Sequence, residues 1–402
     1  MPRLLLTNNH LANYGGSEMV ALELAEEFAD RGWHVDVFTN YADEPFRSEF
    51  EKLAPGGLVR LHEAEAPRTI DHYDLLWVQH GVLPEAIIDS LRSRPAALPL
   101  VWHHMSTLPG IESPVLADIE AAVASLSSFN SAETRDALLQ YGLPENRTEL
   151  LPNPAPRPFT EESPPAPASS DLATVLLVSN HPPAEMTEAI EALAASGVAV
   201  RRVGGDAPAR VTPETFRDVD AVVTIGKTAQ YALCLGIPVY IYDHLGGDGW
   251  LGSDDFETAC LFNFSGRPTK RRISGAAIAR EIIEGYDAAR AFSAERIQEH
   301  RDRFSLRNHV DALLERLADE STPKHPLSAA HAKRWTAYAK MQRDNTRAIH
   351  GAWKANEELQ HSAPELQKTV AELTDANAAL RRSRSYRLGH ALLRPLSRLL
   401  RR

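Results

Sequence analysis

The sequence predicts an α/β protein with two doubly wound, parallel-sheet domains and a C-terminal α-helical extension. Three observations predict this class. A strand-like run, a glycine loop, an amphipathic helix and a second strand open the chain, which is the pattern of a β-α-β unit. The same alternation restarts near residue 172, after a segment rich in proline, serine and alanine that is typical of a linker. From about residue 328 the pattern is purely helical. The predicted segments are domain 1–155, linker 156–171, domain 172–322, helical extension 323–384 with weak coiled-coil character, and basic amphipathic tail 385–402.

The first domain begins with an apolar strand at 3–9, followed by the loop "NYGGSE" at 13–18. The next apolar residues recur at the spacing of one helix face, and acidic residues take the other side. The apolar positions are Ala21, Leu24, Ala25 and Phe28, and the acidic ones are Glu23, Glu26, Glu27 and Asp30. Further strands are predicted at 34–39, 75–80 and 98–104, a helix at 114–126, and a capped helix after Ser131.

The second domain repeats the alternation. Strands are predicted at 173–180, 198–205, 220–226 and 237–243, with a weaker one at 260–266; helices are predicted at 184–195, 227–236 and 275–290. The glycine-rich stretch 243–252 is read as a loop that could cover a ligand. Two such domains leave a cleft between them, and ligands bind beyond the carboxyl ends of the strands. The loops "NYGGSE" and "TIGKTAQ" both lie at such ends.

Composition narrows the function classes. The 402 residues carry a net charge of −11, yet segment 381–402 holds eight arginines and no acidic residue. The acidic body is unsuited to nucleic acid, and the basic tail suits an anionic surface. No apolar run is long enough to span a membrane, and the N-terminus is too polar for a secretory signal. The two cysteines suggest neither a disulfide framework nor a zinc site, so a reducing cytoplasm fits best.

Two loops are candidate phosphate sites. Gly15 and Gly16 open a helix after the first strand, where free N–H groups and the helix dipole favour an anion. Lys227 and Thr228, after Gly226, start a helix in the second domain, and the lysine could neutralise a diphosphate. The structural alternatives are a tight turn without a ligand, and a solvated lysine beside a capping threonine.

The loop "NYGGSE" with its helix resembles the opening of GT-B glycosyltransferases, especially the retaining bacterial polysaccharide and lipopolysaccharide enzymes. The stretches "DLLWVQHG", "LVWHHMS", "SSFNSAE", "LPNPAP" and "GKTAQYALCLGIPVYIYD" follow in that family's order, over about 1–310. The resemblance implies two Rossmann-like domains, with the acceptor on the first and a nucleotide-sugar donor held mainly by the second. It also implies that Asn180 and His181 lie near the donor diphosphate.

One departure from the family concerns its two acidic residues, eight apart, around the helix at 227–236. Val223 and Tyr231 stand at those positions, and Gln230 could hydrogen-bond the ribose instead. A degenerate or regulatory member is therefore an open alternative. The resemblance further implies that a histidine at the end of strand 98–104 faces the transferred sugar, which makes His103 and His104 the catalytic candidates. Because side chains alternate along a strand, only one of them can face the cleft.

The C-terminal region predicts two contacts. Leu366, Val370, Leu373 and Leu380 follow coiled-coil spacing, with Asn377 at the skipped seam position, and this leaves a homo-oligomer open. In the tail, leucines and arginines fall on opposite helix faces, as suits an anionic membrane surface; docking on a partner is the alternative. The predicted membrane-contact residues are Arg387, Leu388, Leu392, Arg394, Arg398 and Arg401.

The resulting hypothesis is a glycosyltransferase of cell-envelope polysaccharide biosynthesis. It would move a sugar from a nucleotide-sugar to a lipid-linked glycan or surface polysaccharide, at the inner face of the cytoplasmic membrane. No metal or other cofactor is expected, because backbone amides and Lys227 can stabilise the departing diphosphate. No nucleic acid is expected, because the body of the protein is acidic. Two alternatives remain: a nucleotide-sugar epimerase of the same fold, and a non-catalytic GT-B-like scaffold.

Overall fold

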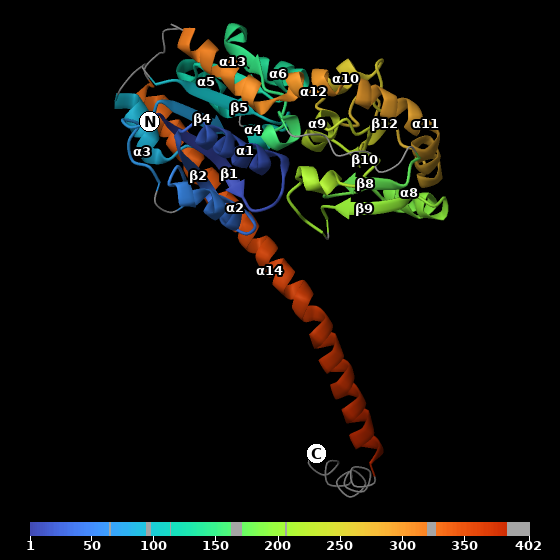
Figure 1. The fold of residues 1–402 in the computed structure, drawn as a ribbon. Coiled ribbons are helices and arrows are strands. Elements are labelled where there is room, and N and C mark those ends of the chain that lie inside the picture. Colours follow the sequence, from blue (N-terminus) through green and yellow to red (C-terminus); the bar gives the residue numbers. More distant parts are fainter. Residues whose placement is uncertain are drawn as a thin grey trace, which may run out of the picture. The chain divides into compact units, whose positions relative to one another are not determined.

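The computed structural model describes residues 1–63, 66–93, 98–112, 114–161, 171–205, 207–319 and 327–383. Contacts divide the chain into two compact units, Met1–Arg343 and Asp344–Arg402. The first unit contains two separate sheets flanked by helices (Figure 1). The predicted fold of two doubly wound α/β domains with a C-terminal helix is therefore confirmed.

The first sheet has seven parallel strands in the order β3-β2-β1-β4-β5-β6-β7. Their bounds are β1 (Arg3–Leu11), β2 (His34–Ala42), β3 (Val59–His62), β4 (Leu75–Gln79), β5 (Leu100–His104), β6 (Leu126–Phe129) and β7 (Thr148–Leu150). Leu4 of β1 pairs with Val35 of β2 on one side and with Leu75 of β4 on the other. The strand order reverses at β1, and such a switch point opens a crevice at the carboxyl edge of the sheet. The loop that carries Gly15 and Gly16 leaves from this point.

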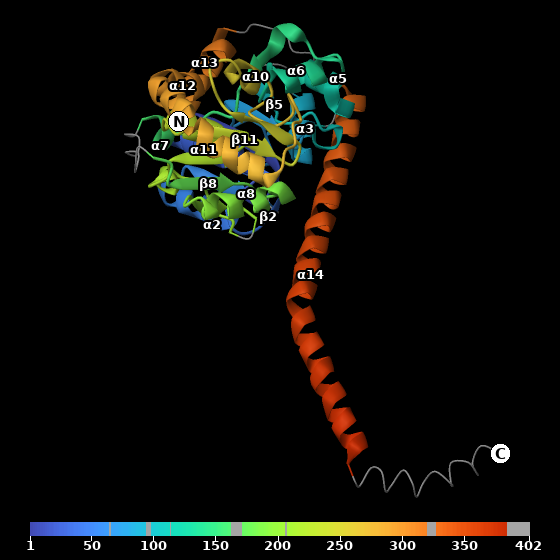
Figure 2. The same ribbon diagram turned by 90° about the vertical axis from the view of Figure 1, so that its right-hand side faces the viewer.

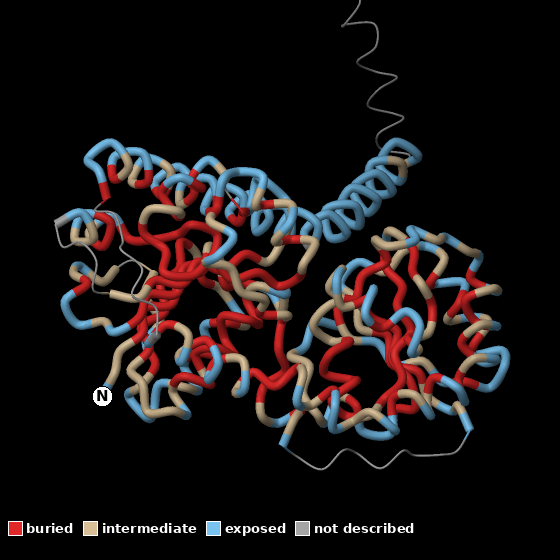
Figure 3. The backbone as a smooth tube through the Cα atoms, turned by 90° about the horizontal axis from the view of Figure 1, so that it is seen from above, coloured by how far each residue is buried: buried red, intermediate tan, exposed pale blue. Residues whose placement is uncertain are grey.

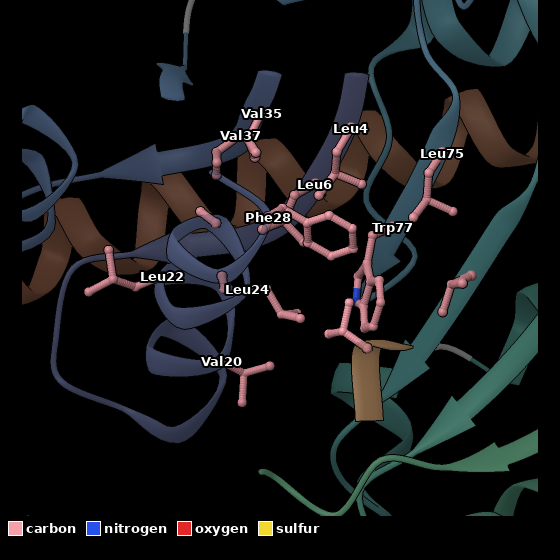
Figure 4. Close-up of a cluster of buried hydrophobic side chains, with 14 of the residues drawn as sticks. Leu4, Leu6, Val20, Leu22, Leu24, Phe28, Val35, Val37, Leu75 and Trp77 are labelled. Carbon is pink, nitrogen blue, oxygen red and sulfur yellow. The ribbon is translucent and has the colours of Figure 1, made fainter. Parts of the chain in front are cut away.

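Helices cover both faces of this sheet. They are α1 (Gly16–Asp30), α2 (Phe46–Leu53), α3 (Glu85–Ser93), α4 (Pro109–Glu112), α5 (Ala117–Val123) and α6 (Ala132–Leu139), with 3-10 turns at Ala54–Gly56, Pro114–Leu116 and Glu145–Arg147. On one face Phe28 of α1 packs edge-on against Trp77 of β4, 6.3 Å between ring centroids (Figure 4). Ser131 caps α6 as predicted, because its side chain accepts a bond from the N–H of Thr134. The sequence pattern does not predict α2 and β3.

The second sheet has five strands in the order β12-β11-β10-β8-β9. Their bounds are β8 (Thr174–Val178), β9 (Ala199–Val203), β10 (Ala221–Thr224), β11 (Val239–Asp243) and β12 (Gly246–Trp250). Helices α8 (Ala184–Ala195) and α11 (Gly275–Glu295) cover one face (Figure 2). Helices α9 (Lys227–Cys234) and α10 (Phe256–Leu261) cover the other, and a 3-10 turn lies at Pro213–Phe216. In both sheets the buried residues concentrate along the strands (Figure 3).

Two predicted elements of the second domain are wrong. The stretch 246–250, read as part of a loop, forms β12, which pairs antiparallel with β11 at the edge of the sheet. The stretch 260–266, read as a weak strand, is instead the end of α10 and a turn, where Asn263 and Phe264 have positive φ angles of 52° and 51°. That left-handed backbone cannot continue a strand.

The chain crosses between the two sheets twice, and the two crossings lie side by side. Ala155, on the way out, pairs with Ser305 on the way back. The outgoing segment forms α7 (Arg157–Thr160), within the predicted linker; the return forms α12 (Ile297–Phe304) and α13 (Leu306–Asp319). Four side chains of α13 pack in the core of the first sheet: Leu306, Val310, Leu313 and Leu317. The predicted domain 172–322 thus includes a helix that belongs to the core of the other sheet.

The last helix is α14 (Ala329–Arg382), which continues through Pro364. Its first turns belong to the first unit. There the Trp335 ring stacks on Trp102 at 5.2 Å, and its indole N–H donates to the carbonyl of Gly81 at 2.9 Å. No helix among the described residues is long and apolar enough to cross a membrane. The predicted membrane-contact residues lie outside the described residues: Arg387, Leu388, Leu392, Arg394, Arg398 and Arg401.

Candidate functional site

A cavity of about 410 Å³ lies where the carboxyl ends of the two sheets' strands meet. This volume is within the usual range for small-molecule sites. Its wall combines loops of the first sheet with loops of the second. The first sheet contributes Tyr14, Gly15, Gly16, Ser17, Met19, Met105 and Asn130, and the second contributes Val178 to His181, Val203, Gly204, Ala209, Val211, Thr224 to Thr228, Tyr231, Asp243, His244 and Asn263. Asn153, at the crossing between the domains, completes it.

A second hollow, of about 470 Å³, is lined by α1, α7 and the loop around Arg210. It contains no strand end, and several of its charged side chains already form ion pairs. Arg210, for example, lies 2.7 Å from Glu26. We therefore assign the candidate ligand site to the cavity at the strand ends.

The structure brings most of the predicted donor-binding residues together. Seven line this one cavity: Gly15, Gly16, Asn180, His181, Gly226, Lys227 and Thr228. Gln230, predicted to bond a ribose, is fully buried and is not part of the wall. One helical turn separates Gln230 from Lys227, and the side chain points into the protein.

A side chain would meet different surroundings at each of the two adjacent glycines. A Cβ at Gly15 would lie 2.6 Å from a carboxylate oxygen of Glu18, which folds back over the start of α1. The side chains of His10, at 3.2 Å, and Ser17, at 2.7 Å, hold that carboxylate. Although burial opposes it, these contacts keep the pKa of Glu18 below its usual value. A Cβ at Gly16 would meet nothing within 4 Å. A side chain at Gly15 would therefore displace the Glu18 carboxylate from these contacts, whereas Gly16 leaves open space at the cavity wall.

This difference gives a matched pair of substitutions. Gly15→Ala is expected to destabilise the protein by about 1 to 3 kcal/mol, the usual range for overpacking. Gly16→Ala is expected to leave the unfolding temperature unchanged but to weaken nucleotide-sugar binding about tenfold, because its methyl group occupies the anion's approach to the helix start. Thermal unfolding and calorimetric titration measure the two effects. A Gly16→Ala protein that binds as the wild type does would exclude this helix start from the ligand site.

Lys227 lines the cavity and also joins the two domains. Its Nζ lies 2.6 Å from a carboxylate oxygen of Glu23 in α1, and it donates to the carbonyl of Pro154 at 2.8 Å. The hydroxyl of Tyr231 donates to the other oxygen of Glu23. Burial, opposed by Lys227, raises the pKa of Glu23. Glu23 is 2% exposed, so the acidic face of α1 is in part an interface with the second domain.

The positions where the family keeps its acidic pair are occupied differently here. Val223 is buried in the core of the second sheet. The Tyr231 ring stacks on Phe159 at 4.1 Å and directs its hydroxyl to Glu23. The carboxylate in contact with this helix thus comes from the other domain. The sequence does not reveal Glu23, because it stands in a run of acidic residues that suits a solvated helix face.

The predicted catalytic histidines do not line the cavity. His103 is completely buried, with Nδ1 2.8 Å from the hydroxyl of Ser128. Burial, helped by the positive charge expected on His104, lowers the pKa of His103 to about 3. This neutral imidazole is enclosed in the first sheet, and its catalytic role stays a prediction. The residue of this strand end that reaches the cavity is Met105.

His104 lies on the opposite side of the strand, held between two buried glutamates. Its Nδ1 is 2.9 Å from Glu112 and its Nε2 is 2.9 Å from Glu120. Burial opposes the charged ring, yet the two carboxylates raise the pKa of His104 to about 10. Glu112 also accepts the backbone N–H of Met105 at 2.9 Å. His104 therefore fixes the segment that carries Met105 to the cavity wall.

The sequence does not single out three amide side chains that lie in the wall, Asn130, Asn153 and Asn263. Asn130 donates to the carbonyl of Met105 at 2.7 Å, and Asn153 donates to Asn263 at 3.0 Å, across the two domains. Among the described residues of the wall, the only carboxylate is that of Asp243. Its oxygens accept the backbone N–H groups of Leu245 and Gly266. The groups available to a ligand therefore include amides, hydroxyls, two imidazoles, backbone N–H groups and one lysine.

Comparison with known proteins agrees with this geometry. Residues 14–156 match the model of Glycosyltransferase Family 4. No curated protein matches the sequence. The match covers the loop of Gly15 and Gly16, strands β2 to β7 and the start of the crossing to the second sheet. This match supports the predicted resemblance to retaining GT-B glycosyltransferases.

Solved structures extend the fold likeness over both domains. HepE from Anabaena in complex with UDP-glucose aligns at 17% identity with a TM-score of 0.51, covering 78% of this chain and 100% of that chain. HepE with UDP and glucose aligns at 15% identity with the same TM-score and coverage. At these identities the likeness establishes the two-domain fold. WaaG, a glycosyltransferase involved in lipopolysaccharide biosynthesis, aligns over 75% of this chain at 12% identity and a TM-score of 0.42.

Proposed function

We propose that the protein is a hexosyltransferase. It transfers a sugar from a nucleotide-sugar donor to a lipid-linked glycan or surface polysaccharide at the cytoplasmic face of a membrane. The observation that carries the proposal is the cavity itself. The starts of α1 and α9 open into one wall, with Gly16 on one side and Lys227 and Thr228 on the other.

The donor diphosphate is proposed to bind between these two helix starts. The first N–H groups of a helix have no partner within it and carry partial positive charge, so they favour an anion. Gly226 has a φ of 61°, a left-handed conformation that suits glycine, so its missing side chain leaves the start of α9 bare. As the bond to the sugar breaks, negative charge grows on the diphosphate, and preorganised N–H donors with Lys227 stabilise it.

The sugar is proposed to lie on the first-domain side, toward Met105, Asn130 and Asn153. Amide side chains offer both donors and acceptors, which suits the hydroxyl groups of a hexose. A uridine diphosphate donor is the first candidate, because the similarly folded HepE was solved with UDP-glucose. With UDP-glucose, the wild type is expected to show donor binding and slow donor hydrolysis. A thermal-shift panel of nucleotide sugars identifies the preferred donor, since a bound ligand raises the unfolding temperature.

The two alternatives predict different results. An epimerase needs catalytic carboxylates in the cavity, and the oxygens of Asp243 are already engaged by backbone N–H groups. A non-catalytic scaffold is favoured by the replacement of the acidic pair by Val223 and Tyr231. If no nucleotide sugar in the panel is bound or hydrolysed, the scaffold is the better account. Interconversion of two nucleotide sugars without an acceptor would instead indicate the epimerase.

Membrane attachment is proposed to rest on the tail 385–402. Its sequence places arginines opposite leucines, and each arginine near an anionic surface contributes about 1 kcal/mol. Vesicles containing phosphatidylglycerol are expected to co-sediment the full chain but not a chain ending at residue 380. High salt should release the protein, because screening shortens the reach of the charges. Equal sedimentation of both chains would place the attachment elsewhere.

A further inference from the structure

The second unit contains a helical stretch whose apolar side has no partner among the described residues of that unit, 344–383. Between Ile349 and Leu380, within α14, residues on one side of the helix recur at alternating steps of three and four, which is a seven-residue repeat. The seam consists of Ile349, Ala352, Asn356, Leu359, Ala363, Leu366, Val370, Leu373, Asn377 and Leu380. We call these ten residues the seam. It doubles the length of the short repeat that is evident around Leu366 to Leu380 alone.

The seam is exposed over its full length. Its leucines, at 359, 366, 373 and 380, are between 61% and 66% exposed, and Val370 is 61% exposed. Isolated helices in water are marginally stable, and most helices gain stability by packing an apolar face. A stripe of large apolar side chains of this length therefore indicates a helix that is completed by a partner.

No charged residue of the stretch 349–380 stands at a seam position. Every charged residue between 349 and 380 occupies a position on the outer side of the repeat: Lys354, Glu357, Glu358, Glu365, Lys368, Glu372 and Asp375. The positions that flank the seam are uncharged, including Ala355, Ser362, Thr369 and Ala376. Two identical seams can therefore meet without bringing like charges together. Pro364 also falls on the outer side, where its effect on the seam is smallest.

The kinds of residue in the seam select the partner. In the first seam position of each repeat stand Ile349, Asn356, Ala363, Val370 and Asn377, and in the second stand Ala352 and the four leucines. Branched residues in the first position and leucine in the second favour two parallel strands. Asparagine in the first position pairs with its own copy across the seam, and so fixes register and oligomer state at some cost in stability.

We propose that the occupant of the seam is a second copy of this chain, and that the two copies form a parallel, in-register, two-stranded coiled coil over 349–380. Asn356 pairs with its equivalent in the other copy, and Asn377 does the same. One consequence concerns the basic segment 381–402, which follows the seam directly in the sequence. A parallel pair carries two copies of this segment at one end, so binding of the first to an anionic surface raises the effective concentration of the second.

The mass of the full chain in solution tests the pairing, measured by sedimentation without membranes or nucleotide sugar. The wild type is expected at twice the mass of one chain. Leu366→Glu with Leu373→Glu should give single chains, because four glutamates would meet in the paired seam. The matched control, Ala371→Glu with Ala379→Glu, adds the same charges on the outer side and should remain paired. A single-chain wild type, or a pair that survives both seam substitutions, would overturn the proposal.

Cross-linking tests direction and register. With Asn377→Cys, two thiols face each other only in a parallel, in-register pair, so mild oxidation should yield a covalent pair. Lys368→Cys lies on the outer side and should stay uncoupled, as should the wild type, whose Cys234 is buried and Cys260 half-buried. Paired mass without a cross-link at Asn377→Cys would contradict the parallel arrangement. Neither readout depends on transferase activity, so this proposal can fail while the proposed function stands.

Discussion

Replacing Lys227 by methionine is expected to lower the free energy of unfolding by about 3 to 5 kcal/mol, the usual result of removing one partner from a buried ion pair. The methionine retains much of the side-chain volume but leaves the carboxylate of Glu23, 2% exposed, without its cation. Denaturant unfolding measures the loss. A change below about 1 kcal/mol, the scale of exposed pairs, would mean that the contact does not join the domains.

The double variant Glu23→Gln with Lys227→Met separates stability from ligand binding. A neutral glutamine can still accept the hydroxyl of Tyr231 and leaves no uncompensated charge, so most of the lost stability should return. Nucleotide-sugar affinity should not return, because the cation that faces the diphosphate is still missing. Glu23→Gln alone should bind at least as tightly as the wild type, since Lys227 is released from its carboxylate. A double variant with wild-type affinity would reduce Lys227 to a link between domains.

Replacing His104 by glutamine is expected to cost about 3 to 5 kcal/mol as well, because Glu112 and Glu120 are both buried and lose the cation between them. The wild type should also show a distinctive pH dependence. The pKa of His104 is about 10 in the folded protein, against about 6.5 when unfolded. A raised folded pKa contributes stability that is fully present below about pH 6.5 and is lost as the pH rises toward 10.

Unfolding measurements between pH 6 and 10 on the wild type and on His104→Gln check this expectation. The free energy of unfolding of the wild type should fall across the range. The slope should be about 1.4 kcal/mol per pH unit where the folded His104 keeps a proton that the unfolded chain has released. The variant should lack this slope. His103→Gln is the matched control in the same strand. Burial holds the pKa of His103 near 3, so its removal should leave the slope intact. Identical slopes in all three proteins would contradict a charged His104.

The sequence predicts the fold and much of the cavity for one physical reason. Parallel strands present their carboxyl ends at one edge, so loops that follow different strands converge there. Gly16 and Lys227 are more than two hundred residues apart, yet each follows such a strand, and both line the cavity. Two predicted residue pairs reach the wall for the same reason: Asn180 and His181 after β8, and Lys227 and Thr228 at the start of α9. The amphipathic pattern of α1 likewise gives its buried apolar face correctly.

The failures have physical causes as well. Periodicity identifies which side of a helix is polar, but not whether that side meets water or another domain, so the sequence does not reveal that Glu23 is buried. Gln230 lies nearly one turn further along α9 than Lys227 and is fully buried there, which the sequence does not show. Parallel strands are buried on both faces, so the alternation of His103 and His104 does not bring either ring to the cavity. The return of α13 to the first sheet is a long-range contact that no local pattern signals.

The central claim is that the cavity between the two sheets holds a sugar diphosphate at the starts of α1 and α9. A crystal structure of the protein with UDP-glucose tests it most directly. We expect the two phosphates within hydrogen-bond distance of the backbone N–H groups at Gly16 and Thr228, with Lys227 Nζ turned toward them. UDP-glucose bound with its phosphates outside this cavity, or a cavity that contains no ligand at saturating UDP-glucose, would contradict the account.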